Sequence, residues 1–154
     1  MKSLIRIVIA CGLLGAAFNA GAQGMPGAHP GYLHALTDLR SARWYLEHRP
    51  AADGRIHADE DTAITHIDHA ISDLKQASIY DGKNVYDHPP SDVGERGSEL
   101  MKAIENLRQA HADVDQEEDN PQVRGLKHRI LDRIDRATQA AQGAHDEWIR
   151  LGKP

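Results

Sequence analysis

The chain has 154 residues, ten histidines, a single cysteine and a formal net charge of −5 at pH 7 when the histidines are neutral. Its acidic balance argues against nucleic acid or an anionic lipid surface as the partner, because both carry negative charge themselves. The length suffices for one domain with a core of its own.

The first residues have the pattern of an export signal. Lys2 and Arg6 are basic, residues 4–18 are largely apolar, and residues 20–22 (AGA) form a small-residue cleavage site. We therefore predict that residues 1–22 are a signal peptide, cleaved near Ala22, and that the mature chain is periplasmic or secreted. The apolar run is too short to remain as a membrane span, which needs roughly 20 residues.

Cleavage would remove Cys11, the only thiol, together with both basic residues of the signal. The mature chain of 132 residues then has 16 basic and 23 acidic residues, a formal charge of −7, and must be stabilised by its core rather than by disulfides. Residues 8–11 (VIAC) also resemble a lipoprotein cleavage box, but the apolar run after Cys11 fits an ordinary signal better.

The leader and the first helix follow. Residues 23–30 are rich in Gly and Pro and are predicted to be a flexible leader, before a folded domain over residues 31–152. Residues 31–48 have the apolar spacing of a helix, and Pro50 and Asp53-Gly54 then break the chain. The apolar face of this helix consists of Tyr32, Leu36, Leu39 and Leu46.

The second predicted helix is the stretch around which the chain is organised. Asp59 is expected to cap its start, and the helix runs to Ala77, with a possible continuation in phase towards Val85. Residues 81–97 contain several Gly and Pro residues and form the long connection that follows. The apolar stripe of this helix consists of Ile64, Ile67, Ile71 and Leu74.

Two more helices are predicted in the second half. Asp92 and Glu95 resemble a capping box before the third helix, and Asn120-Pro121 is a strong start signal for the fourth. The third helix carries Leu100, Ile104, Leu107 and Val114 on its apolar face. The fourth keeps a seven-residue pattern through Val123, Ile130, Ile134, Ala137, Ala141, Ala144 and Trp148.

The two halves of the chain are similar to each other. Residues 35–42 (ALTDLRSA) match residues 103–110 (AIENLRQA), and residues 67–70 (IDHA) match residues 134–137 (IDRA) at nearly the same offset. We therefore predict an all-α fold, an antiparallel four-helix bundle made of two similar helical hairpins. In this topology the starts of helices 1 and 3 and the ends of helices 2 and 4 meet at one end, which brings His145 towards Asp81.

The second helix offers the first candidate site. His66, His69 and Asp73 share one polar face within about one turn of helix. Neutral imidazoles and a carboxylate are ligands of Zn²⁺, Cu²⁺ and Ni²⁺, so the sequence predicts a divalent metal site here. The alternative is a solvated polar face. The second half has Arg133, Arg136 and Ala140 at the matching positions, so the site is not duplicated.

The connection that follows offers the second candidate site. This stretch is rich in oxygen ligands and ends in a histidine, so Asp81, Asp87 and His88 are its predicted metal ligands. Long loops in compact domains are also often functional. Ordinary loop packing is the alternative, since Asp, Gly and Pro are common in loops. We expect the connection to be ordered, with Tyr86 covering the bundle end and with Asp87 and His88 facing helix 1 or helix 4.

Other chemistry is sparse. Arg43 and His111 fall on the apolar stripes at matching repeat positions and are expected to pair with carboxylates at the core edge. Haem is conceivable in an exported bundle, with Met101 as a weak ligand candidate, and Trp44 and Trp148 are expected in the core or at its boundary. The sequence contains no GxSxG, HExxH or phosphate-binding glycine loop, so we predict no enzyme activity.

The exported leader, the histidine-bearing Ala-rich helices and the paired hairpins resemble small periplasmic helical-bundle proteins, including the small metal-binding protein family. That family carries much denser histidine repeats. The block from Asp81-Gly82-Lys83-Asn84 to Asp87-His88-Pro89-Pro90 resembles the signature of a small exported bacterial family of unassigned function. The resemblance implies a helical bundle and carries no functional residue.

These observations together predict a non-enzymatic periplasmic bundle that binds a divalent transition-metal ion. Two alternatives stay open at this point. One is a protein-interaction or envelope-stress module without a metal. The other is a carrier of haem or of a small ligand.

Overall fold

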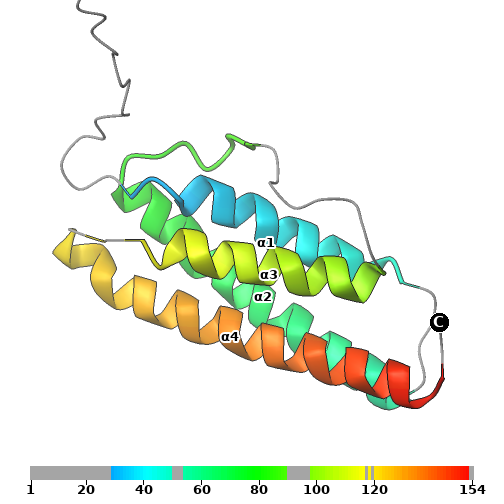
Figure 1. Cartoon of the computed structure of the whole chain (residues 1–154). Helices are drawn as coiled ribbons and strands as arrows, with labels where there is room; N and C mark the ends of the chain where they lie inside the picture. The colour runs from blue at the N-terminus through cyan, green and yellow to red at the C-terminus, as the bar shows by residue number, and fades with distance from the viewer. Residues whose placement is uncertain (1–28, 50–53, 90–97, 117, 119, 153–154) are drawn as a thin grey trace, which may run out of the picture.

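The computed structural model describes residues 29–49, 54–89, 98–116, 118 and 120–152. These residues form four helices and no strand (Figure 1), which confirms the prediction of an all-helical chain. The helices are α1 (Tyr32–Glu47), α2 (Gly54–Tyr80), α3 (Glu99–Val114) and α4 (Pro121–Arg150). The predicted signal peptide and most of the predicted leader lie outside the described residues. No helix of the described chain is long and apolar enough to span a membrane.

Each helix packs against two others around one core. Helix α1 contacts α2 and α3, and α4 also contacts α2 and α3, so α1 and α4 are diagonal to each other. The predicted stripes supply this core, because an apolar face on each helix must be covered by its neighbours. Its fully buried large side chains include Tyr32, Leu36, Leu39, Ile56, Ile67, Leu74, Leu100, Leu107, Ile130 and Ile134. Ile64, Ile71 and Trp148 are partly buried at its edge.

Two helix starts follow from capping residues. Asn120 accepts a hydrogen bond from the backbone N–H of Gln122 at 3.0 Å, and Pro121 begins α4, as predicted. Ser98 caps α3 through the N–H of Met101. The predicted capping box of Asp92 and Glu95 lies outside the described residues.

The start of α2 differs from the prediction. The helix begins at Gly54 rather than at Asp59. Ile56, Glu60 and Ala63 are buried at helical spacing, so the buried face extends further towards the N-terminus than the stripe around Ile67 suggested. The extra turn therefore adds buried surface, which outweighs the weak helix propensity of glycine.

The end of α2 is fixed by Gly82. Its φ of +69° is easily adopted only by glycine. The N–H of Gly82 donates to the carbonyl of Ile79 at 3.0 Å, and the N–H of Lys83 donates to that of Ser78 at 2.8 Å. This pair of bonds is the Schellman arrangement. It ends the helix at Tyr80, so the helix does not continue towards Val85.

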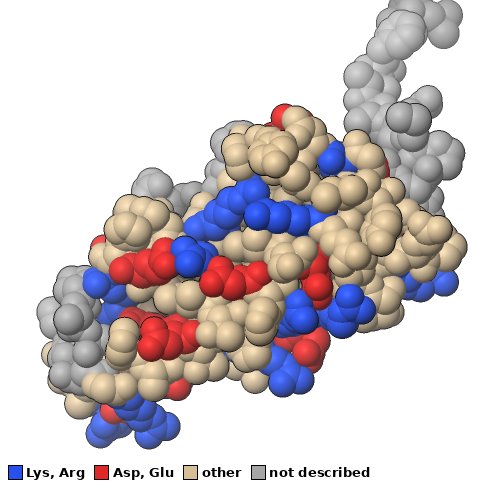
Figure 2. Space-filling view, turned by 180° about the vertical axis from the view of Figure 1, so that it is seen from behind, with Lys and Arg blue, Asp and Glu red and all other residues tan. Residues whose placement is uncertain are grey.

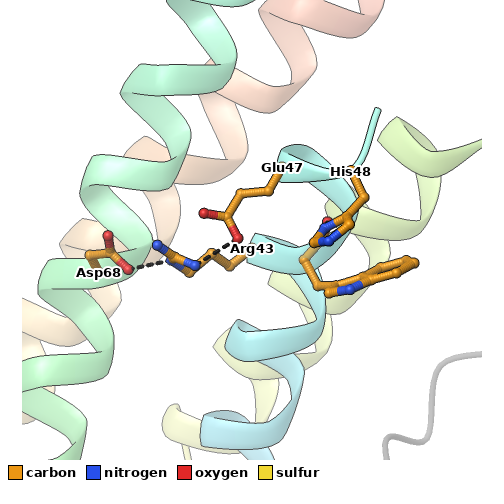
Figure 3. Close-up of polar contacts among 5 residues, drawn as sticks. Arg43, Glu47, His48 and Asp68 are labelled. Atoms are coloured by element: carbon orange, nitrogen blue, oxygen red, sulfur yellow. Dashed lines mark hydrogen bonds and ion pairs between the residues drawn. The ribbon is translucent and has the colours of Figure 1, made fainter. Parts of the chain in front are cut away.

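Matching positions of the two halves make matching ion pairs. Arg43 Nε lies 2.7 Å from Asp68 Oδ1, which links α1 to α2 (Figure 3). His111 Nε2 lies 3.4 Å from Asp135 Oδ1, which links α3 to α4. Because both pairs sit at equivalent repeat positions, they support a duplicated helical hairpin. The expectation that Arg43 and His111 pair with carboxylates is confirmed.

The predicted grouping of helix ends is wrong. The backbone N–H of His29, just before α1, donates to Asp81 Oδ2 at 2.7 Å, and His29 Nε2 lies 3.2 Å from the carbonyl of Gln116, just after α3. The end of α3 therefore joins the start of α1 and the end of α2. At the opposite end, Arg49 lies over the ring of Trp148 at 4.6 Å. His145, near the end of α4, therefore lies towards the end of the bundle opposite Asp81.

The physical reason is that α2 and α3 end on the same side of the molecule. The chain between them must then pass along the bundle rather than turn at its end, which is a crossover connection of the kind some bundles use. Figure 1 shows the described part of this connection, residues 81–89, running beside α1. A repeat in sequence fixes the fold of each hairpin but not which way the second hairpin points relative to the first.

Candidate functional site

The six predicted metal ligands lie in three separate places. His66, His69 and Asp73 are on α2, Asp81 is in a buried polar cluster at one end, and Asp87 and His88 are on the exposed connection beside α1. Among the described residues, no group of three or more His, Cys, Asp or Glu side chains is arranged to hold a metal ion.

On α2, the carboxylate of Asp73 is paired with arginines of α4. Arg133 Nη1 lies 2.5 Å from Asp73 Oδ2, and Arg129 Nε lies 3.4 Å from the same oxygen. Partial burial, followed by the positive charge of Arg136, lowers the pKa of His66. Neutral imidazole suits a metal, but the surrounding arginines oppose any added cation.

Asp81 belongs to a closed polar cluster where three parts of the chain meet. Its Oδ2 accepts the His29 backbone N–H, and its Oδ1 lies 3.5 Å from Asn120 Nδ2. Burial raises the Asp81 pKa, partly opposed by these hydrogen bonds. Both carboxylate oxygens thus have partners within the protein.

The remainder of the cluster is built on His29 and Tyr32, which are 1% and 0% exposed. Their rings stack with centroids 3.8 Å apart, and the Tyr32 hydroxyl donates to Glu118 Oε2. The Gly31 N–H donates to His29 Nδ1 at 3.2 Å, so the proton of the neutral ring must be on Nε2, facing the Gln116 carbonyl. Burial lowers the His29 pKa and, with the Glu118 bond, raises that of Tyr32.

The structure describes the connection up to residue 89, and its aromatic residue does not pack as predicted. Tyr86 is 82% exposed, so it does not cover the bundle end. A local turn accounts for this: the Asp87 N–H donates to the Asn84 carbonyl at 3.0 Å, and Asn84 Nδ2 donates to Asp87 Oδ1 at 3.1 Å. The turn directs Asp87 to its own loop rather than to another helix.

His88 does face α1, as predicted. Arg40 Nη1 lies 2.8 Å from His88 Nδ1, and Arg40 Nη2 donates to the Val85 carbonyl at 3.4 Å. A single arginine of α1 therefore holds the connection at two points. Because a guanidinium only donates, His88 Nδ1 must act as the acceptor in this bond.

A hollow of about 260 Å³ lies where the connection meets α1. Four of its residues lie on one face of α1, because their spacing of three, four and seven residues follows the helix turn. Trp44 forms one wall and is 52% exposed, and its ring stacks on His48 at 4.4 Å. The lining residues are Thr37, Arg40, Ser41, Trp44, Tyr45 and His88.

The charge of Arg40 distinguishes this hollow from the rest of α1. Arg43 is paired with Asp68 and Glu47, and Arg49, just after α1, is paired with Glu60. Arg40 forms no ion pair with any described residue. Burial lowers the Arg40 pKa. Elsewhere, Figure 2 shows basic and acidic side chains interspersed on one face of the molecule.

The sequence pointed to one residue of this hollow, His88, and missed the others. Trp44, expected in the core or at its boundary, is instead largely exposed. The available signal was the spacing of Thr37, Arg40, Ser41 and Trp44, which together form a second, polar-aromatic face on an otherwise ordinary amphipathic helix. That face becomes a hollow only because residues 81–89 pass beside it.

No family model matches the chain, and no significant match was found among curated proteins or among solved structures. The function must therefore be argued from the residues themselves.

Proposed function

We propose that this chain is an exported, non-enzymatic helical-bundle protein that binds a small ligand in the hollow between α1 and residues 81–89. We also propose that its helices form the antiparallel bundle of two similar hairpins expected from the repeat. The equivalent ion pairs of Arg43 with Asp68 and of His111 with Asp135 support the second proposal.

One observation carries the ligand proposal. The exposed Trp44 ring stands beside a 260 Å³ hollow that also contains a guanidinium without a carboxylate partner among the described residues. Small-molecule sites combine an apolar or aromatic wall with a few polar groups in a concave surface. Trp44 supplies the aromatic surface and Arg40 supplies a positive charge at the same concave place, which favours a binding role.

The transition-metal hypothesis has weaker support. Zn²⁺, Cu²⁺ or Ni²⁺ at His66 and His69 would have to take Asp73 from Arg133 and Arg129. A metal on the connection would find Asp81, Asp87 and His88 engaged with His29, Asn84 and Arg40 respectively. The haem alternative has no support from Met101, which is 40% exposed.

The test is a fragment screen by NMR on the mature, ¹⁵N-labelled chain. We expect fragments to shift the indole N–H resonance of Trp44 and the amide resonances of residues 37–45 and 85–88. The same spectra recorded with Zn²⁺, Cu²⁺ and Ni²⁺ compare the metal hypothesis directly, through shifts or broadening at His66 and His69.

A matched control uses the other tryptophan. The Trp148→Phe variant keeps Trp44 as the only indole and should give the same fragment shifts, whereas Trp44→Ala should remove them. The proposal fails if no fragment shifts the Trp44 indole, or if all hits map to surfaces elsewhere on α2, α3 or α4.

A further inference from the structure

We infer that the ligand of this hollow is a small planar organic carboxylate, with its carboxylate on Arg40 and its plane against the Trp44 ring. The inference rests on the proposed function and deepens it by naming the chemical class. Three features of the hollow support this ligand class: its charge, its aromatic wall and its size.

The two halves of the chain differ in the charges beside a matching arginine. Arg40 and Arg108 occupy matching positions of the internal repeat. Arg108 lies 3.7 Å from Glu105, one helix turn before it, whereas the residue matching Glu105 in the first half is Thr37. The first half therefore keeps the arginine but has no acidic residue at the matching position one helix turn before it.

Among the described residues, both partners of Arg40 are neutral. They are the Nδ1 atom of His88 at 2.8 Å and the carbonyl oxygen of Val85 at 3.4 Å. A carboxylate is a stronger acceptor for a guanidinium than either group, because the bond is then charge-assisted and can be bidentate. An anionic ligand thus gains an interaction that the described residues do not supply.

The aromatic wall favours a flat ligand. Trp44 is already in edge contact with Tyr45 and stacked on His48, so its orientation is set by its neighbours. Residues 41 and 37, a serine and a threonine, line the hollow one and two helix turns away. The matching position of Trp44 in the second half is Ala112, so the wall is not repeated there.

The volume of the hollow, which is open to solvent, limits the part of the ligand that lies inside it. Its volume of about 260 Å³ lies below the usual range of drug-sized pockets, roughly 300–1,000 Å³. Benzene fits a cavity of about 150 Å³, so one ring with a carboxylate group is the appropriate scale.

The experiment uses the mature Trp148→Phe chain, in which Trp44 is the only fluorophore of its kind. Benzoate, benzyl alcohol, acetate and inorganic phosphate are titrated at constant ionic strength, with the Trp44 indole resonance as a second readout. We expect benzoate to bind at about millimolar Kd and benzyl alcohol, acetate and phosphate each to bind about tenfold more weakly.

The variants separate charge from fold. Arg40→Gln should weaken benzoate binding about tenfold, and Arg40→Lys, which keeps the charge but loses the planar fork, should lie between it and the parent. Arg108→Gln is the matched control from the other half and should leave the benzoate affinity unchanged. Circular dichroism of each variant verifies that the helices are retained.

The failure of this inference can be told apart from failure of the proposed function. If benzoate and benzyl alcohol bind equally tightly, or if Arg40→Gln and Arg108→Gln weaken benzoate binding equally, the ligand is not a carboxylate. The site would then still bind a small ligand. If acetate or phosphate binds as tightly as benzoate, the site does not select a planar ring. If a carboxyl-terminal peptide binds and benzoate does not, the partner is a protein. Fragment hits that all avoid Trp44 remove the proposed function itself.

Discussion

The closed polar cluster at the bundle end and the open hollow on α1 use similar side chains for opposite purposes. In the cluster, His29 is buried and both ring nitrogens face backbone groups of the protein. In the hollow, His88 is exposed and only Nδ1 has a described partner, the guanidinium of Arg40. Polar groups that satisfy one another stabilise a fold, whereas polar groups left facing solvent are available to a ligand.

The largest expected effect concerns two tyrosines, one in the cluster and one on the connection. Tyr32→Ala should lower the free energy of unfolding by about 3–5 kcal/mol, because it removes a fully buried aromatic ring and leaves Glu118 without its hydroxyl donor. Tyr86→Ala should change it by less than about 0.5 kcal/mol, because that ring is largely exposed. Urea denaturation followed by circular dichroism measures both. Similar losses for the two variants would contradict the assignment of the cluster as structural.

A smaller effect is expected at Gly31, where the chain enters α1. A Cβ atom there would lie 2.2 Å from the carbonyl oxygen of Asp113, which is backbone and cannot swing aside. Gly31→Ala should therefore destabilise the fold by about 1–3 kcal/mol. The control is Gly125, whose added Cβ meets nothing within 4 Å. Gly125→Ala, in the interior of α4, should instead stabilise by up to about 1 kcal/mol. Thermal unfolding of the two variants should shift in opposite directions.

The cluster should also make stability depend on pH. Because burial lowers the His29 pKa, the unfolded chain binds a proton more readily than the folded chain as the pH falls below about 6.5. Stability is then fully present above that pH and is lost as the pH falls through the lowered pKa, by at most about 1.4 kcal/mol per pH unit. Glu118 and Asp81 oppose the lowering, and Lys127 adds to it.

The measurement is the free energy of unfolding between pH 4 and pH 8 for the parent and for His29→Asn. The variant should lose part of the acid-side slope. Asp81 titrates in the opposite sense: its raised pKa gives stability that is lost as the pH rises, so it cannot produce the same slope. A parent and a His29→Asn variant with the same slope would rule out His29 as its source.

The sequence predicted the helices well because each has an apolar stripe of the right period and clear end signals. Asn120-Pro121 marked the start of α4 correctly, and the repeat placed Arg43 and His111 on equivalent ion pairs. It placed the start of α2 five residues late, because Asp59 has the features of a cap and the burial of Ile56 depends on helices distant in sequence.

The sequence could not predict the site in the same way. Helical period shows which residues share a face, but it does not show which other segment passes over that face. The direction of the second hairpin decides that, and it sends residues 81–89 beside Arg40 rather than towards His145. Asp73 was likewise predicted to be a metal ligand. Its partner Arg133 is 60 residues away in sequence, so the sequence did not reveal the ion pair.

The smallest expected effect on stability is at His88, and it sharpens the contrast with His29. His88→Ala removes one hydrogen bond to an exposed loop, so the free energy of unfolding should change by less than about 0.5 kcal/mol. The local effect should be larger, because Arg40 then holds the connection only through the Val85 carbonyl at 3.4 Å. Hydrogen exchange at residues 83–88 should become faster while exchange in α1 and α2 stays the same. Ser72→Ala, on an exposed part of α2, is the control for a neutral surface change. If His88→Ala slowed the exchange of residues 83–88 or left it unchanged, the bond between His88 and Arg40 would not hold the connection in place. Other contacts would then have to hold the side of the hollow that the connection forms.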